Sequence, residues 1–161
     1  MNKLIYVETT IPSFYFDTRL ESAVQIRRQW TREWWDSPRT GQQLVTSFIV
    51  IQELEDIPGP KRNDTLEMIR SLRLLEYTAE VADIVRVYFE HKLMPREVMG
   101  DADHLALASY YKCDMLVTWN CRHLANANKQ SHIRRVNALL GLETPLLVTP
   151  LELLGKDADE Y

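Results

Sequence analysis

The stretch LIYVETTIP, residues 4–12, sets the structural pattern for the whole chain. Its first four residues are apolar and rich in β-branched and aromatic side chains, which is typical of a short buried strand. The polar residues Glu8, Thr9 and Thr10 follow at once, and the proline that ends the stretch suits the first turn of a helix. We therefore predict a strand over residues 4–7 that leads directly into a helix.

The same alternation of short apolar strands with helices recurs along the rest of the chain. Further strands are predicted at residues 44–46, 74–77, 115–118 and 146–148. Helical spacing of apolar residues is found at residues 20–37, 47–54, 63–72, 79–91, 101–111 and 129–140, with a last helical turn at 150–154. Continuous apolar strands that alternate with helices predict an α/β domain in which a parallel sheet of four to five strands lies between two helical layers.

Length and composition predict one domain, over residues 1–155, followed by a short acidic tail at residues 156–161. A chain of 161 residues that is 45% hydrophobic can bury a core without disulfide bonds. No stretch resembles a signal peptide or a membrane span, so a cytoplasmic location is predicted. For the same reason both cysteines, Cys113 and Cys121, are expected to be reduced and packed.

Charge is distributed unevenly along a chain whose net charge is −4. The net value argues against a protein that coats nucleic acid non-specifically. However, no acid lies between Asp114 and Glu143, and that segment carries four cations, which are Arg122, Lys129, Arg134 and Arg135. Such a segment either lines a phosphate path or forms a solvated helix face, and charge alone leaves both readings open.

Three acids far apart in the chain are the main candidates for chemistry. Glu8 stands directly after a predicted strand, where ligands bind in doubly wound sheets. Glu53 lies in an otherwise apolar helix, and Asp101 comes at the first turn of an alanine-rich helix. A buried carboxylate needs a partner or a metal ion, and hard divalent cations prefer carboxylate oxygen. For Asp101 the local sequence alone favours a helix cap, or an acid that complements the helix dipole, over a metal ligand.

Four stretches make the chain similar to the PIN-domain nucleases, and most nearly to the VapC-type toxins of toxin–antitoxin pairs. YVETT at residues 6–10 resembles the family's first strand, and residues 47–53 resemble its serine-to-glutamate helix. DADHLALA at residues 101–108 resembles its aspartate-led alanine helix, and TWNCRHL at residues 118–124 resembles its Thr-x-Asn loop. The resemblance covers roughly residues 3–125.

The resemblance implies a PIN-like three-layer fold and a ribonuclease that uses Mg²⁺ or Mn²⁺. It implies that Glu8, Glu53 and Asp101 are the catalytic residues and hold the metal, directly or through water. Four further residues are expected to position these ligands, which are Thr9, Ser47, Thr118 and Asn120. The implied substrate is RNA, and the implied protein partners are an antitoxin and a second copy of the chain.

Two residues depart from the family pattern. The family's first acid is usually aspartate, whereas Glu8 is one methylene longer, and His123 stands where a fourth acid is usual. We therefore expect a three-carboxylate site with weakened metal affinity. Asp103 is expected to be solvated, because it points about 200° away from Asp101 on the helix, and His104 is expected to be a hydrogen-bonded packing histidine.

Two other functions are compatible with the same residues. A PIN-like module that has lost its chemistry would serve as a binding or assembly protein, and the departures at Glu8 and His123 motivate that reading. A small-molecule α/β enzyme is the third reading, although no nucleotide fingerprint supports it. The tryptophans of residues 30–35 and Trp119 suit core packing as well as contacts with a partner or a base.

Overall fold

A parallel sheet of five strands forms the centre of the computed structural model, which describes residues 2–155. The strands are β1 (Lys3–Val7), β2 (Gln42–Ser47), β3 (Arg73–Leu75), β4 (Met115–Val117) and β5 (Leu146–Val148). Their order across the sheet is β3-β2-β1-β4-β5, and neighbouring strands are parallel. The predicted α/β class and the predicted parallel sheet are confirmed.

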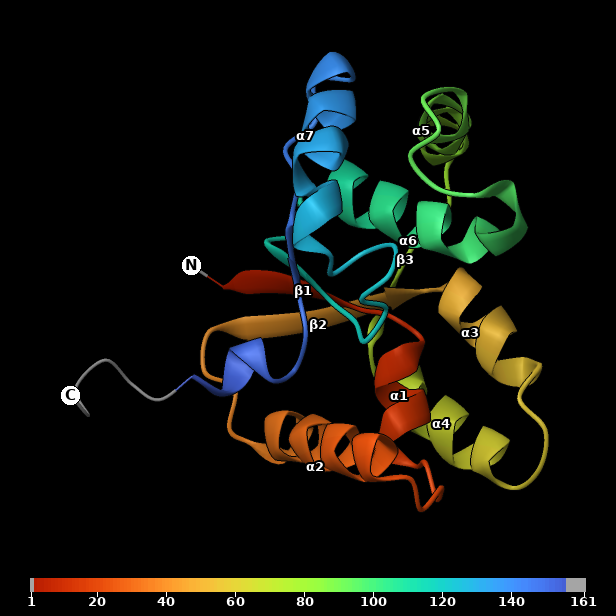
Figure 1. Ribbon diagram of the computed structural model, residues 1–161, viewed down its shortest axis with the longest axis vertical. Helices are drawn as coiled ribbons and strands as arrows, with labels where there is room; N and C mark the ends of the chain where they lie inside the picture. Colours follow the sequence, from red (N-terminus) through yellow and green to blue (C-terminus); the bar gives the residue numbers. More distant parts are fainter. Residues whose placement is uncertain (1, 156–161) are drawn as a thin grey trace.

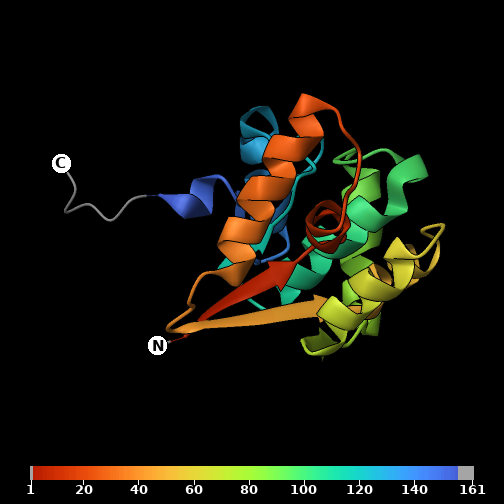
Figure 2. The ribbon, with the colours of Figure 1, turned by 90° about the horizontal axis from the view of Figure 1, so that it is seen from below.

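Helices cover both faces of the sheet, as the prediction of three layers requires. Within residues 2–155 they are α1 (Thr10–Tyr15), α2 (Ser22–Asp36), α3 (Phe48–Glu55), α4 (Lys61–Arg70), α5 (Ala79–Glu90), α6 (Met99–Tyr110) and α7 (Gln130–Leu139), with single turns η1 (Arg96–Val98), η2 (Ala127–Lys129) and η3 (Glu152–Leu154). In Figure 1, α5, α6 and α7 lie on one side of the sheet, whereas α1, α2 and α4 lie on the other. Figure 2 views the molecule from the second side and shows β1 and β2 running side by side in the same direction.

The strand order reverses at β1, and this reversal creates the place where a site is expected. The chain first moves from β1 outward to β2 and β3, then returns to the other side of β1 to form β4 and β5. In open α/β sheets, ligands bind at the carboxyl ends of the strands beside such a reversal. The register pairs Val7 with Val117, so the residues that follow these two strands, Glu8 and Thr118, emerge next to each other.

Helix α6 packs against the sheet by a face of small and branched apolar residues. Among its described apolar side chains, five are completely buried, which are Ala102, Leu105, Ala106, Leu107 and Ala108. Apolar residues surround most of the helix, which is typical of a helix in the interior of a domain. The alanines allow α6 to approach its neighbours closely, and this brings its first turn toward the carboxyl end of β1.

Trp119 ties helix α2 to the loop that follows β4. Its indole is 6% exposed, and its Nε1 donates a hydrogen bond of 2.8 Å to Thr31 Oγ1 of α2. Trp30 stacks on the same ring with the ring centres 6.1 Å apart, and the Arg27 guanidinium lies 5.2 Å from its centre. Trp119 is therefore a buried wall of the site region, and Trp30 is partly buried against the core.

Three expectations about the remainder of the chain have different outcomes. The acidic tail, residues 156–161, lies outside the described residues. Cys113 is buried as expected, but Cys121 is exposed, because it lies in the turn after β4 and points away from the core. None of the helices between residues 2 and 155 is both long and apolar enough to cross a membrane.

An ion pair on a buried carboxylate closes the loop between α1 and α2. The Asp17 carboxylate is only 5% exposed and receives a charged hydrogen bond of 2.8 Å from Arg19 Nη2, while Lys61 Nζ of α4 lies 3.7 Å away. The hydrogen bond from Arg19 lowers the pKa of Asp17 to about 2, although burial acts in the opposite direction. The ionised carboxylate therefore stabilises the fold.

Replacing this carboxylate is expected to lower the free energy of unfolding in a pH-dependent way. At pH 7, Asp17→Asn should cost about 2 kcal/mol, because the folded pKa lies below the ordinary value. The stability difference from the parent protein should be constant above about pH 5 and should narrow as the pH falls from about 4 toward 2. Urea unfolding at several pH values measures it, with the exposed Asp56→Asn as the control; a difference that does not depend on pH contradicts the ion-pair argument.

Candidate functional site

Glu8 is a buried acid held by three hydrogen-bond donors. It follows β1, is 3% exposed, and its backbone N–H still donates to Val117 of β4. Its Oε2 accepts hydrogen bonds from Thr10 N at 2.9 Å, from Thr10 Oγ1 at 2.5 Å and from Thr118 Oγ1 at 2.8 Å. Burial raises the pKa of Glu8 above its ordinary value, while the charge of His104 and these hydrogen bonds act against that rise. The carboxylate is thus fixed in place at a cost in stability.

The same two threonines connect the loops after β1 and β4. Trp119 N donates to Thr10 Oγ1 at 2.8 Å, and Asn120 N donates to Thr118 Oγ1 at 2.9 Å. Thr118 therefore has the supporting place that the sequence predicts. Thr10 was missed, although a second hydroxyl directly after the acid was a visible signal in the sequence.

Glu53 reaches the site from helix α3 and is oriented by two donors. Its Oε1 accepts a hydrogen bond from Thr9 Oγ1 at 3.1 Å and lies 2.5 Å from His104 Nε2. Burial alone would raise the pKa of Glu53, but the hydrogen bond and charge of His104, with the bond from Thr9, leave it below the ordinary value. Gly100 permits this position, because a Cβ built there would lie only 3.1 Å from both carboxylate oxygens of Glu53.

His104 is completely buried and joins the acids to the interior of the sheet. Its Nδ1 lies 2.7 Å from the hydroxyl of Tyr6, which in turn lies 2.6 Å from Ser47 Oγ. Burial would lower the pKa of His104, but the hydrogen bond and charge of Glu53, and the charges of Glu8 and Asp101, raise it above the ordinary value. The negative charges of the three carboxylates thus favour the protonated form of the imidazole.

This role of His104 goes beyond what the sequence predicted. The expected burial and hydrogen bonding are confirmed, and its partners are the candidate ligand Glu53 as well as Tyr6 of the core. Spacing held a usable signal, because His104 comes three residues after Asp101 and therefore shares its helix face. Ser47 acts at a distance, since its hydroxyl contacts Tyr6 and reaches the site through His104.

Asp101 contributes a carboxylate oxygen that lacks a partner. Its Oδ2 is buried and has no hydrogen bond to any group in residues 2–155. Burial raises the pKa of Asp101, while the side chain of Asn120 and the charges of His104 and His123 lower it in part. Helix α6 begins after Val98, so Asp101 lies inside the first turn and is not the N-cap residue. An orphan buried acceptor costs free energy until a cation or a proton reaches it.

The neighbouring acid Asp103 is not part of this arrangement. Its Oδ1 accepts a hydrogen bond of 2.6 Å from the hydroxyl of Tyr77, and the side chain is half-buried. The expectation of a solvated side chain is wrong, because Tyr77 covers it.

The carboxylate oxygens of these residues suit a hard divalent cation, but their spacing does not surround one. Glu8, Glu53 and Asp101 offer carboxylate oxygens, and the orphan Asp101 Oδ2 is a natural ligand. Yet the part of the chain from residue 2 to 155 contains no three His, Cys, Asp or Glu side chains close enough to surround one ion. Mg²⁺ keeps several of its waters in proteins. An ion at this place therefore needs only one or two direct carboxylate ligands, and the other carboxylates can act through bound water.

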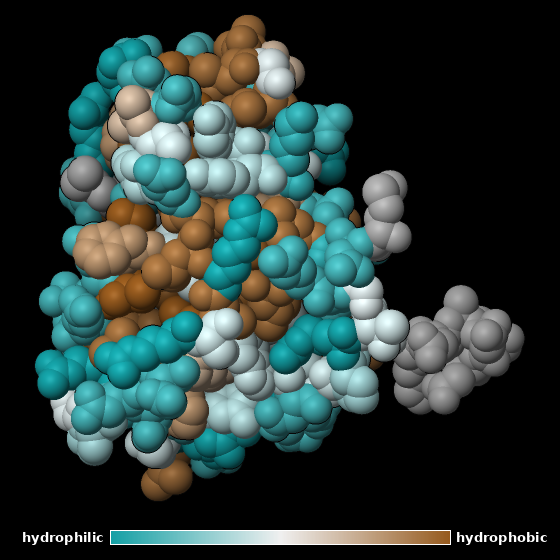
Figure 3. All heavy atoms as spheres, turned by 180° about the vertical axis from the view of Figure 1, so that it is seen from behind, coloured by the Kyte–Doolittle hydropathy of each residue, from teal (hydrophilic) through white to brown (hydrophobic). Residues whose placement is uncertain are grey.

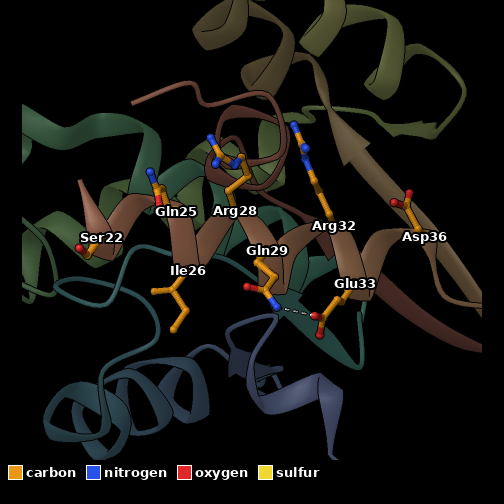
Figure 4. A pocket seen from close by; sticks show the side chains of 8 residues that line it. All are labelled: Ser22, Gln25, Ile26, Arg28, Gln29, Arg32, Glu33 and Asp36. Atoms are coloured by element: carbon orange, nitrogen blue, oxygen red, sulfur yellow. Dashed lines mark hydrogen bonds between the residues drawn. The ribbon is translucent and has the colours of Figure 1, made fainter. Parts of the chain in front are cut away.

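A hollow on the outer face of α2 is a separate feature and not the candidate site. Figure 4 shows that its side chains all come from this one helix, and Gln29 donates a hydrogen bond of 3.0 Å to Glu33 within it. Binding sites usually collect polar groups from several elements, and here none of the three acids takes part.

The buried charge of Glu8 is expected to lower the stability of the metal-free protein. Because burial raises the folded pKa of this acid, its ionised form opposes folding at neutral pH, and Glu8→Gln should raise the free energy of unfolding. The gain should disappear below about pH 4, where the carboxyl is protonated in both states. Thermal unfolding in chelator measures it, with the exposed Glu55→Gln as the matched control on α3; a loss of stability at pH 7 contradicts the argument.

Comparisons with other proteins leave the geometry as the basis for a functional assignment. No protein-family model, no curated protein and no solved structure matches this chain.

Proposed function

We propose that this chain is a metal-dependent endoribonuclease of the PIN-domain type, with Glu8, Glu53 and Asp101 as its catalytic residues. The observation that carries the proposal is the convergence of three acids from β1, α3 and α6 around His104, beside the reversal of strand order. The unpartnered buried oxygen of Asp101 supports a cation at this place. The resemblance of residues 3–125 to the family points to the same chemistry.

Each residue has a definite task in this proposal. A bound Mg²⁺ or Mn²⁺ would supply stabilisation of the charge on the phosphate and a lower pKa for a water molecule. Glu8, Glu53 and Asp101 would hold the ion, directly or through water. Thr10 and Thr118 keep the Glu8 carboxylate from rotating. His104 fixes Glu53 and offsets part of the negative charge before a cation arrives.

The proposed partners follow from the resemblance and not from the site. An antitoxin and a second copy of the chain would both need an apolar surface to cover. Figure 3 shows hydrophobic residues gathered across the middle of one face, with hydrophilic residues on either side. This band is compatible with a covered surface. A cytoplasmic location belongs to the same proposal.

Removing the Asp101 charge is expected to abolish cleavage without unfolding the protein. Asp101→Asn should lower the rate of Mn²⁺-dependent RNA cleavage by at least about 100-fold, because the carboxylate with the unpartnered oxygen loses its charge at a site built on three acids. Asp103→Asn is the matched control two residues away and should retain most of the activity. Cleavage of a labelled RNA is followed with and without chelator, and thermal unfolding verifies the fold.

The proposal fails if the parent protein cleaves RNA equally well in excess chelator. It also fails if Asp101→Asn and Asp103→Asn lose activity to the same extent, since the three acids would then have no special role in cleavage.

Two observations favour a second function. Glu53 is already paired with His104, and residues 2–155 hold no group of three ligands around one point. Under this reading the chain is a PIN-like binding or assembly module without chemistry. A Mn²⁺ titration by calorimetry separates the two functions. The nuclease should bind the ion saturably and lose this binding in Glu53→Gln, whereas the module should show no such binding.

A further inference from the structure

A basic hollow lies next to the acidic site and takes no part in the site described above. Its volume is about 680 Å³, and it is formed by the end of α5, the turn that follows, η1, and the segment that leads into α7. Its basic lining consists of Lys92, Arg96, His123, Lys129 and His132. These side chains come from separate elements, which distinguishes the hollow from the solvated face of a single helix.

The charge of the hollow is positive in a protein that is negative overall. Lys92, Arg96 and Lys129 face a single acid, Glu90, so the lining carries +2 even when both histidines are neutral. None of these three cations forms a salt bridge with an acid of residues 2–155. Unpaired cations that converge on one concave surface attract anions.

The floor of the hollow is apolar, and one cation lies flat upon it. Phe89, Leu93 and Met94 contribute this floor, and the Arg96 guanidinium lies 5.2 Å from the centre of the Phe89 ring. Guanidinium groups and aromatic rings are the surfaces on which nucleotide bases stack in proteins that bind single strands. The hollow therefore combines charges for phosphate with surfaces for bases.

The hollow adjoins the acids through the loop after β4. His123 N donates a hydrogen bond of 3.0 Å to Asn120 Oδ1, so the loop that brings Asn120 to the site also holds His123 at the hollow. Burial lowers the pKa of both His123 and Lys129, and the negative charge of Asp101 raises it in part for each. That influence indicates that Asp101 lies close to both residues.

We propose that this basic hollow binds the phosphate backbone of the single-stranded RNA beside the scissile phosphate and so guides the strand to the three acids. This inference rests on the proposed nuclease function. It explains why the fourth acid of the resembled family is replaced by His123 in this chain. An acid at that position would repel the backbone that the neighbouring cations attract.

The backbone conformation of Lys92 allows one of these charges to be removed without disturbing the fold. Lys92 has a φ of 52°, a left-handed conformation that favours glycine, and Leu93 N donates to Tyr88 O in the motif that ends α5. Lys92→Gly therefore removes the cation without strain in the fold. Lys112 follows α6 in the same way, with a φ of 56°. It precedes β4 and therefore lies at the amino ends of the parallel strands, away from the acids at their carboxyl ends.

RNA binding in chelator tests the proposal without cleavage. The probe is a fluorescently labelled single-stranded RNA of about 12 nucleotides. The test variant is Lys92→Gly with Lys129→Gln, and the matched control is Lys112→Gly with Arg62→Gln on α4, which loses the same charge elsewhere. The test variant should weaken binding by at least about 10-fold and reduce the slope of log affinity against log salt by about 1.4. The control should bind like the parent protein.

The outcomes separate this inference from the proposed function. Equal binding by the parent protein and the test variant overturns the inference, and so does an equal loss in the control or a parent protein that binds no RNA. If cleavage depends on Asp101 while the test variant binds normally, the nuclease function stands and the hollow has another role. If the test variant loses binding but the parent protein never cleaves RNA, the hollow is a binding site and the nuclease function fails.

Discussion

The register between β1 and β4 is the constraint on which the candidate site depends. Pairing Val7 with Val117 places the buried acid after one strand beside the hydroxyl after the other, and Thr118 then donates directly to Glu8. A shift of one residue would turn every side chain of β4 to the opposite face of the sheet. The loop that carries Asn120 and His123 would move with it. The central strand thus sets both the core and the position of the functional groups.

Like charges held close together need compensation, and here one imidazole provides much of it. Glu8, Glu53 and Asp101 each raise the pKa of His104, and His104 lowers the pKa of each acid in return. The buried hydrogen bonds from His104 to Tyr6 and from Tyr6 to Ser47 fix the orientation of the imidazole ring. Such an arrangement lets a metal-free protein fold around three carboxylates while one oxygen of Asp101 remains available.

The fold was predictable from sequence because its strands are continuous apolar runs, such as residues 4–7, and a run of this kind requires burial on both faces. The positions of Glu8 and Glu53 were predictable for a related reason, since a carboxylate within apolar surroundings needs a partner. The hydrogen-bond partners of these carboxylates were not predictable. Whether Thr9 or Thr10 donates to Glu8 depends on the local turn, and the pairing of His104 with Glu53 depends on how closely α6 approaches α3 at Gly100. Short-range spacing contains no information on that approach.

The packing of Trp119 against α2 places an intrinsically fluorescent residue beside the site. This indole lies beside the residues that hold Glu8 and Asp101, and it stacks on Trp30 while its N–H is bonded to Thr31. Any event that shifts the loop after β4 must change the surroundings of two neighbouring indoles, and indole emission responds to such changes. A ligand that moves this loop on binding would therefore change a signal intrinsic to the polypeptide, and its binding could be followed in solution without a label.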